Sequence, residues 1–227
     1  MLFSRNFFLY SIMSTTIPVA QQYDTILILD FGSQYTHLIA RRIREFGVYC
    51  ELFACTTPIS EIPFTPTGVI LSGGPYSVYA PGSPHVDPMV WKLNVPVLGI
   101  CYGLQEISFT RGGKVESCES KEFGKAIINV LADSALFSGI DKEMTVWMSH
   151  GDQVTSLPTG FVVTAATNTA PFAAVERIED RIYGIQFHPE VTHTPAGGLL
   201  LKNFAVGICG TRASWTMVTL FNKGVVY

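Results

Sequence analysis

The chain has 227 residues, 48% of them hydrophobic and 15% charged, and a formal net charge of −3 at pH 7, which predicts one domain with a substantial buried core. Its longest basic cluster is Arg41-Arg42, so the sequence indicates no face that would bind nucleic acid. The five cysteines lie far apart, without C-x-x-C pairs or zinc-finger spacing, which argues against a disulfide framework or a metal site and favours reduced thiols in a cytoplasmic protein.

The first 23 residues differ in composition from the rest. They contain no acidic residue, one arginine (Arg5) and a short apolar run, Phe7–Tyr10. A run of this length cannot span a bilayer, so we expect no membrane partner. A mitochondrial or secretory leader is the alternative; against it, the segment has a single positive charge and no clear A-x-A cleavage site. We expect residues 1–23 to be a disordered or leader-like extension.

From Thr25 onward, short β-branched runs alternate with helical patterns. The run Thr25–Asp30 predicts a buried strand, and Ser33–Phe46 predicts a helix that ends at Gly47. This alternation is typical of an α/β fold with an open, mostly parallel (flavodoxin-like) sheet and helices on both faces. Further strands of this half are expected at Val48–Phe53, Gly68–Leu71 and Val95–Ile100.

The second half has strand-like runs with few helices between them, which predicts an antiparallel or mixed extension of the sheet. A last helix is expected from Gly197 to about Ile208. Without an internal repeat or a low-complexity linker, residues 24–215 are interpreted as one domain. The expected strands are Ala126–Val130, Thr145–Met148, Phe161–Thr164, Ala173–Arg177 and Arg181–Phe187.

Cys101 occupies the most informative position of the chain. A buried strand runs into the pattern G-x-C-x-G and then into a helical pattern. Gly99 and Gly103 permit a sharp strand-to-helix turn that exposes residue 101, as in a nucleophile elbow. A helix N-terminus directly after the cysteine would favour its thiolate. The alternative is a small core cysteine flanked by incidental glycines.

His188-Pro189-Glu190 follows an apolar strand. Residues two apart in an extended segment point to the same side, so Glu190 can support an imidazole that faces the thiol. Cys101, His188 and Glu190 would then be a nucleophile, a base and an orienting acid. The alternative is a His-Pro turn at a strand end with a solvated glutamate.

Two further motifs are candidate parts of the same site. The glycines of Leu71–Pro75 (LSGGP), directly after a strand, can aim N–H groups at an anion and form an oxyanion hole with the N–H of Tyr102, although such a segment alone is more often a turn. Met148–Asp152 is interpreted as a polar loop closing a strand. In it, His150 is a rival base, ranked below His188 because the only carboxylate placed near it, that of Asp152, lies across a glycine turn.

In this order, these motifs resemble the class I (triad) glutamine amidotransferases, and among them the amidotransferase domains of GMP synthases. The resemblance covers about Asp24 to Trp215. The specific segments are DFGSQYTHLIARRIRE (Asp30–Glu45), LSGGPYSVY (Leu71–Tyr79), GICYGLQE (Gly99–Glu106), WMSHGD (Trp147–Asp152) and GIQFHPEVTHT (Gly184–Thr194).

The resemblance implies roles for individual residues. Cys101 would attack the carboxamide of L-glutamine, His188 would shuttle the proton and Glu190 would hold His188. The backbone N–H groups of Gly74 and Tyr102 would bind the oxyanion. The residues implied to bind glutamine are Gln105, Ser149, His150, Gly151 and Asp152.

The resemblance also implies a partner. A cysteinyl thioester would be hydrolysed to glutamate, and the ammonia would pass to an ATP-pyrophosphatase (synthetase) domain, in cis or in trans, that amidates ATP-activated XMP to GMP in purine nucleotide biosynthesis. The chain leaves the family pattern after Met217, so residues 216–227 are read as a divergent tail in place of that domain. ATP and Mg²⁺ are expected only for the missing synthetase domain, and no cofactor for this one. The alternatives are another cysteine hydrolase of this fold, such as a γ-glutamyl peptidase, or a non-catalytic regulatory module.

Overall fold

The computed structural model describes residues 18–216, with the backbone alone for residues 119–121. Within them the chain forms a nine-stranded sheet with the strand order β2-β1-β3-β4-β9-β8-β7-β5-β6. The strands are β1 (Thr25–Asp30), β2 (Tyr49–Ala54), β3 (Gly68–Leu71), β4 (Val97–Ile100), β5 (Lys114–Val130), β6 (Glu143–Ser156), β7 (Val162–Ala166), β8 (Ala174–Arg177) and β9 (Ile182–Ile185).

The sheet changes character between its two halves. From β2 to β9 in the sheet order, neighbouring strands are parallel, and from β9 to β6 they are antiparallel. Strands β3 and β4 are buried along their whole length, as expected for parallel strands covered on both faces. The predicted α/β fold, with a parallel first half and an antiparallel extension, is confirmed.

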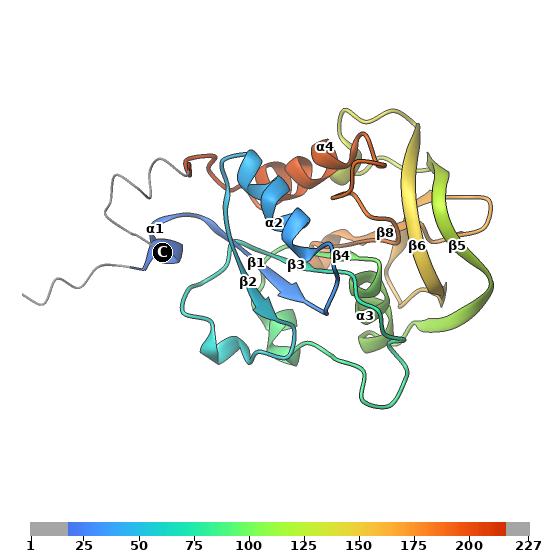
Figure 1. The fold of residues 1–227 in the computed structure, drawn as a ribbon, viewed down its shortest axis with the longest axis horizontal. Coiled ribbons are helices and arrows are strands. Elements are labelled where there is room, and N and C mark those ends of the chain that lie inside the picture. The colour runs from blue at the N-terminus through green and yellow to red at the C-terminus, as the bar shows by residue number, and fades with distance from the viewer. Residues whose placement is uncertain (1–17, 217–227) are drawn as a thin grey trace, which may run out of the picture.

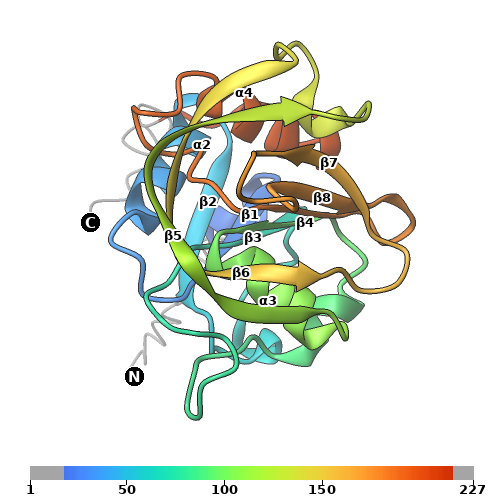
Figure 2. The same cartoon turned by 90° about the vertical axis from the view of Figure 1, so that its right-hand side faces the viewer.

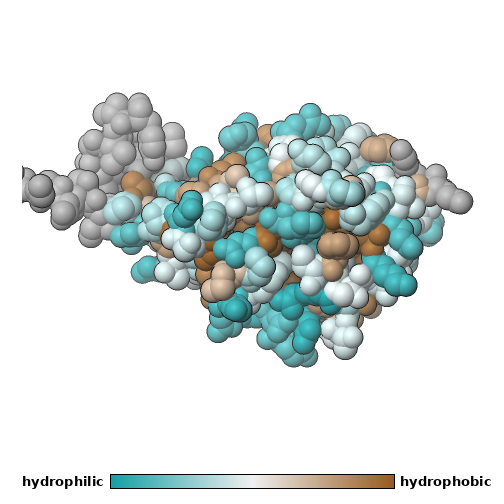
Figure 3. Space-filling model, turned by 90° about the horizontal axis from the view of Figure 1, so that it is seen from below, coloured by the Kyte–Doolittle hydropathy of each residue, from teal (hydrophilic) through white to brown (hydrophobic). Residues whose placement is uncertain are grey.

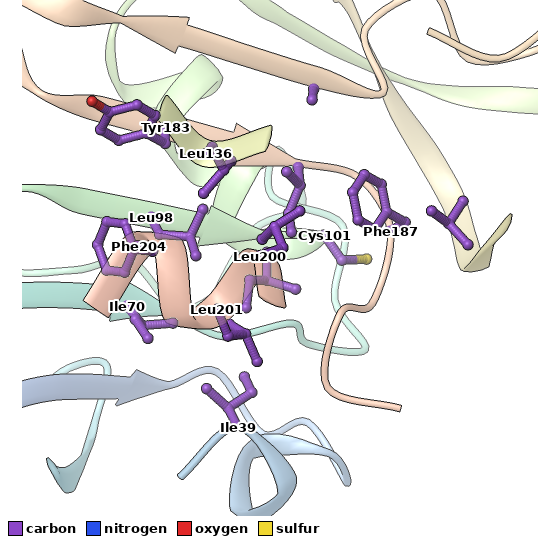
Figure 4. Close-up of a cluster of buried hydrophobic side chains, with 14 of the residues drawn as sticks. Ile39, Ile70, Leu98, Cys101, Leu136, Tyr183, Phe187, Leu200, Leu201 and Phe204 are labelled. Carbon is purple, nitrogen blue, oxygen red and sulfur yellow. The ribbon is translucent and has the colours of Figure 1, made fainter. Parts of the chain in front are cut away.

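Helices cover both faces of the parallel half (Figure 1). Side chains of α2 (Thr36–Glu45) and α4 (Gly197–Lys202) pack into one core cluster, and those of α3 (Tyr102–Thr110) into the cluster on the opposite face. The last predicted helix is present, but its second half, Asn203–Ile208, is a π-helical turn. Figure 4 shows the sulfur of Cys101, a member of the first cluster, directed away from Leu98 and Phe204.

The antiparallel ribbon is longer than the sequence predicted. Strands β5 and β6 pair from Lys114 and Ser156 at one end to Asn129 and Glu143 at the other, and Figure 2 shows how strongly β5 curves. Met148–Asp152 therefore lies inside β6, and its interpretation as a loop is wrong. Its polar residues fit a strand because Ser149, His150 and Asp152 pair with β5 and this stretch of β6 borders a pocket.

The expected N-terminal extension is partly folded. Residues Val19–Gln22 form a short helix, α1, whose Ala20 is buried. The hydroxyl of Thr25 donates to the carbonyl oxygen of Ala20 (2.8 Å), and the side-chain amide of Gln21 donates to that of Pro63 (2.7 Å). The prediction of a disordered segment is therefore wrong for residues 18–23. Residues 1–17, and the tail beyond residue 216, lie outside the described part of the chain.

On the face shown in Figure 3, hydrophobic residues occur in small groups among hydrophilic ones. No helix in the described part of the chain is long and apolar enough to cross a membrane. Among the side chains that the structure describes, no group of three or more His, Cys, Asp or Glu is arranged to hold a metal ion.

Candidate active site

Cys101 is the single residue between the end of β4 and the start of α3. Its backbone has φ 53° and ψ −104°, a conformation that residues other than glycine seldom adopt and that costs energy. Its N–H donates to the carbonyl oxygen of Ile185 on β9 (2.7 Å), which holds the turn in place. The thiol therefore lies at the end of a central strand and at the N-terminus of a nine-residue helix, as the sequence predicted.

Both glycines of the elbow are required by close packing. A Cβ on Gly103 would overlap the carbonyl oxygen of Leu71 on β3, and one on Gly99 would lie 2.5 Å from the backbone of Gly103. The glycines thus let α3 approach the strands beneath it. The pattern G-x-C-x-G encodes this close approach as well as the turn.

His188 and Glu190 follow β9 and come together beside Cys101. The distance from His188 Nδ1 to Glu190 Oε1 is 2.8 Å, and the two side chains are only 5% and 1% exposed. The His188 N–H donates to the carbonyl oxygen of Trp147 on β6 (3.0 Å), and the hydroxyl of Thr194 donates to the His188 carbonyl oxygen (2.7 Å). The backbone of His188 is therefore fixed on both sides.

The electrostatics of His188 favour its protonated form. Burial opposes the charge, but hydrogen bonds and charge interactions with Cys101 and Glu190 outweigh it and raise the pKa of His188 well above its ordinary value.

Gly73 lies against both His188 and Cys101. A Cβ added to Gly73 would lie 3.1 Å from His188 Cε1 and 3.8 Å from Cys101 Cβ. The arrangement suits a protonated imidazole beside the Cys101 sulfur.

The two predicted oxyanion donors lie close together next to this pair. A Cβ on Gly74 would lie 2.8 Å from the carbonyl oxygen of Phe31 and 3.4 Å from Tyr102 Cγ, so only glycine fits there. Tyr102 is the first residue of α3, and its N–H therefore has no acceptor within the helix. The N–H of Gly74 has no hydrogen-bond acceptor within residues 18–216.

A pocket of about 640 Å³ opens over Cys101 and His188. The amide nitrogen of Gln105 donates to the carbonyl oxygen of Asp152 (2.9 Å), and Cys101 Sγ lies 3.7 Å from that of Ser149. All the residues implied to bind glutamine therefore border one cavity. They are Gln105, Ser149, His150, Gly151 and Asp152.

Other parts of the pocket wall were not assigned from the sequence. The turn Gly32–Tyr35 forms one side; Asp30 holds it by accepting from the N–H of Gly32 (2.9 Å) and from the hydroxyl of Thr36 (2.6 Å). The segment DFGSQY was the available signal for this turn. The remaining unassigned wall residues are Gly74's neighbours Pro75, Tyr76, Ser77 and Tyr79, and Ser117 and Phe123 of β5.

The prediction that no carboxylate other than Asp152 is placed near His150 is wrong. His150 Nε2 lies 3.1 Å from Glu122 Oε2, on the neighbouring strand β5. The two residues are 28 positions apart, and only the pairing of β5 with β6 brings them together. No local spacing in the sequence signals this contact.

The sequence of the chain matches a known protein family. The class-I glutamine amidotransferase family model matches residues 27–208. The chain is 56% identical over 206 residues to "GMP synthase [glutamine-hydrolyzing]" of Yarrowia lipolytica and 54% identical over 206 residues to that of Saccharomyces cerevisiae, in each case over 90% of this chain and 39% of the relative. It thus spans about two fifths of the length of these relatives.

Solved structures agree with the fold. A Thermoplasma acidophilum protein described as part of a GMP synthase superposes with a TM-score of 0.72 at 34% identity, over 83% of this chain and 94% of that one. A glutamine amidotransferase from Thermotoga maritima superposes with a TM-score of 0.60 at 18% identity, over 90% of this chain and 86% of that one, a likeness of fold alone.

Proposed function

The chain belongs to the class I glutamine amidotransferase family, and from this premise we propose that it hydrolyses L-glutamine to L-glutamate and ammonia. Cys101 is the nucleophile, His188 the proton shuttle and Glu190 the residue that orients His188. The observation that carries the proposal is the buried His188–Glu190 pair, 2.8 Å apart, beside a cysteine held on a strained strand-to-helix turn.

In the first half of the reaction, the Cys101 thiolate attacks the carboxamide carbon of glutamine. The carbonyl oxygen becomes an oxyanion, to which the N–H groups of Gly74 and Tyr102 donate. The His188 imidazolium then gives its Nε2 proton to the amide nitrogen as the carbon–nitrogen bond breaks. Ammonia leaves, and a γ-glutamyl thioester remains on Cys101.

In the second half, neutral His188 takes a proton from water as the water oxygen attacks the thioester carbon. The carbon–sulfur bond breaks, glutamate leaves, and Cys101 returns to the thiolate beside an imidazolium. Glu190 accepts the Nδ1–H hydrogen bond throughout, which keeps Nε2 directed at the thiol. No proton transfer to Glu190 is required.

The pocket supplies recognition of the substrate. Gln105 and the β6 segment Ser149–Asp152 border the same cavity as Cys101, so their polar groups are the ones we assign to the α-amino and α-carboxylate groups of glutamine. The proposed chemistry uses no cofactor or metal in this domain.

We further propose that the ammonia serves amidation of XMP to GMP by an ATP- and Mg²⁺-dependent synthetase domain, in cis or in trans. The support is the identity of 54–56% to proteins named glutamine-hydrolysing GMP synthases, of which this chain matches 39% of the length. Their remaining length is where such a synthetase would lie.

Glutamate and ammonia release by the wild-type chain and by Cys101→Ala tests the first proposal. Release from glutamine but not from γ-glutamyl peptides, and none with Cys101→Ala, is expected. Preference for the peptides would make the chain a γ-glutamyl peptidase, and no turnover of either would favour a non-catalytic module.

The second proposal is tested by adding the synthetase domain of a yeast GMP synthase with ATP, Mg²⁺ and XMP. GMP should form from glutamine only when both proteins are present.

A further inference from the structure

A second imidazole–carboxylate pair lies directly behind the pocket. Glu122 on β5 and His150 on β6 are cross-strand partners, with Nε2 and Oε2 3.1 Å apart. Their side chains are 14% and 1% exposed. The reaction described above does not use Glu122.

The imidazole of His150 supports the pocket wall from behind. His150 borders the cavity, yet the residue is 4% exposed and its side chain 1%, and Nδ1, the ring nitrogen that does not face Glu122, is buried. The cavity therefore meets mainly the backbone at this position. This differs from the direct glutamine contact that the family resemblance implied for His150.

The backbone on either side of His150 contacts the catalytic machinery. The carbonyl oxygen of Ser149 lies 3.7 Å from Cys101 Sγ, and that of Asp152 accepts from the amide nitrogen of Gln105 (2.9 Å). A shift of this short stretch of β6 would therefore move the floor of the pocket relative to the nucleophile.

Regular strand pairing is interrupted at this same place. Ser117 is opposite Asp152, but the next paired residue of β5 is Glu122, opposite His150, so residues 118–121 are set against Gly151 alone. A bulge of this kind removes ladder hydrogen bonds and re-aims the strand. The Glu122–His150 contact is the side-chain link that closes the ribbon immediately after the bulge.

We propose that Glu122 is a positioning residue of the glutaminase site, which acts by holding His150 and thereby the β6 backbone from Ser149 to Asp152 against Cys101 and Gln105. The inference rests on the proposed glutamine hydrolysis. Because a carboxylate only accepts hydrogen bonds, Glu122 places the imidazole proton on Nε2. Burial lowers the pKa of His150, opposed by Glu122, which agrees with a neutral ring.

The first test compares glutamine kcat/KM of the wild type, Glu122→Ala, Glu122→Gln and the matched control Glu116→Ala. Glu116 lies on the same strand and accepts from the hydroxyl of Thr155 on β6 (2.6 Å), but it is exposed and does not itself border the pocket. We expect Glu122→Ala to lose roughly tenfold to a hundredfold, as for a misplaced site. Glu122→Gln, which keeps an acceptor oxygen, should recover most of the rate, and Glu116→Ala should stay within about twofold of the wild type.

A double-mutant comparison tests whether Glu122 acts through His150. Glu122→Ala combined with His150→Ala should lose no more than the larger single change, because both remove the same contact. Additive losses would overturn the proposal, as would an unaffected Glu122→Ala or a Glu122→Gln as impaired as Glu122→Ala.

Inhibition by two glutamine fragments separates support of the wall from direct binding. Glutaramate lacks the α-amino group and 4-aminobutanamide lacks the α-carboxylate. If His150 supports the wall, His150→Ala should weaken inhibition by both to the same extent; weakening of only one would show that the imidazole binds the group this fragment retains, which contradicts the proposal. An inactive wild-type chain would refute the proposed function, whereas an active wild type with the contrary mutant results would refute only the role of Glu122.

Discussion

Replacing Gly73 with alanine would add a methyl group close to both His188 and Cys101. The added Cβ would lie 3.1 Å from His188 Cε1 and 3.8 Å from Cys101 Cβ. Carbon atoms in contact are normally about 3.5–4.0 Å apart, so the imidazole would have to move by roughly 0.4 Å or more. It cannot retreat freely, because Nδ1 is 2.8 Å from Glu190 Oε1 and the backbone N–H of His188 donates to Trp147 (3.0 Å).

The size of the effect follows from this displacement. A misplacement of about 1 Å can cost about 10²-fold in rate, so a shift of about half that predicts roughly a tenfold loss of kcat/KM, or about 1.4 kcal/mol. Gly73 does not have a left-handed backbone conformation, so alanine is allowed there. The free energy of unfolding should therefore change by less than about 1 kcal/mol.

Glutamate release measured over a range of glutamine concentrations checks this prediction, with denaturant unfolding on the same samples. Gly198→Ala is the matched control, because its Cβ would meet only Phe46 Cζ, at an ordinary 3.9 Å. A Gly73→Ala variant with wild-type kcat/KM would show that His188 does not have to occupy its present position. A large loss of stability would show that Gly73 serves the fold instead.

Three further predictions concern the same domain. Glu190→Gln should reduce turnover less than His188→Ala, because a poorly held imidazole still transfers protons; equal losses in steady-state assays would assign Glu190 a direct acid–base role. The pKa of His188, followed by NMR, should fall in Cys101→Ala, because burial would then be opposed by Glu190 alone. Since the folded-state pKa is raised, the stability that protonated His188 contributes should be complete below its unfolded pKa of about 6.5 and lost as the pH rises through the folded pKa. The difference in melting temperature between the wild type and His188→Ala should therefore become smaller at alkaline pH. A chain that starts at Asp24 should melt several degrees below one that starts at Pro18, because α1 and its buried Ala20 are lost; equal melting temperatures would show that α1 adds nothing to the fold.

The sequence alone was sufficient where the relevant interactions are local. The strand–G-x-C-x-G–helix order placed Cys101 at an elbow because the strand, the turn and the helix are encoded close together along the chain. The spacing of two between His188 and Glu190 was enough to pair them, since an extended backbone directs both side chains to one side. The alternation of short strand-like runs with helical patterns likewise predicted a mostly parallel sheet with helices on both faces, and β3 and β4 are buried along their whole length.

Tertiary structure decided what depends on strand register and on packing between distant segments. Glu122 meets His150 only because β5 bulges after Ser117 and resumes pairing beyond Gly151 of β6, and no pattern within either strand specifies where pairing resumes. The same pairing turned Met148–Asp152 from an expected loop into a strand that forms the pocket floor. Ala20 is part of the core because α1 packs against apolar residues of a neighbouring strand. A four-residue helix is too short to show a periodic apolar pattern, so the sequence did not predict this contact.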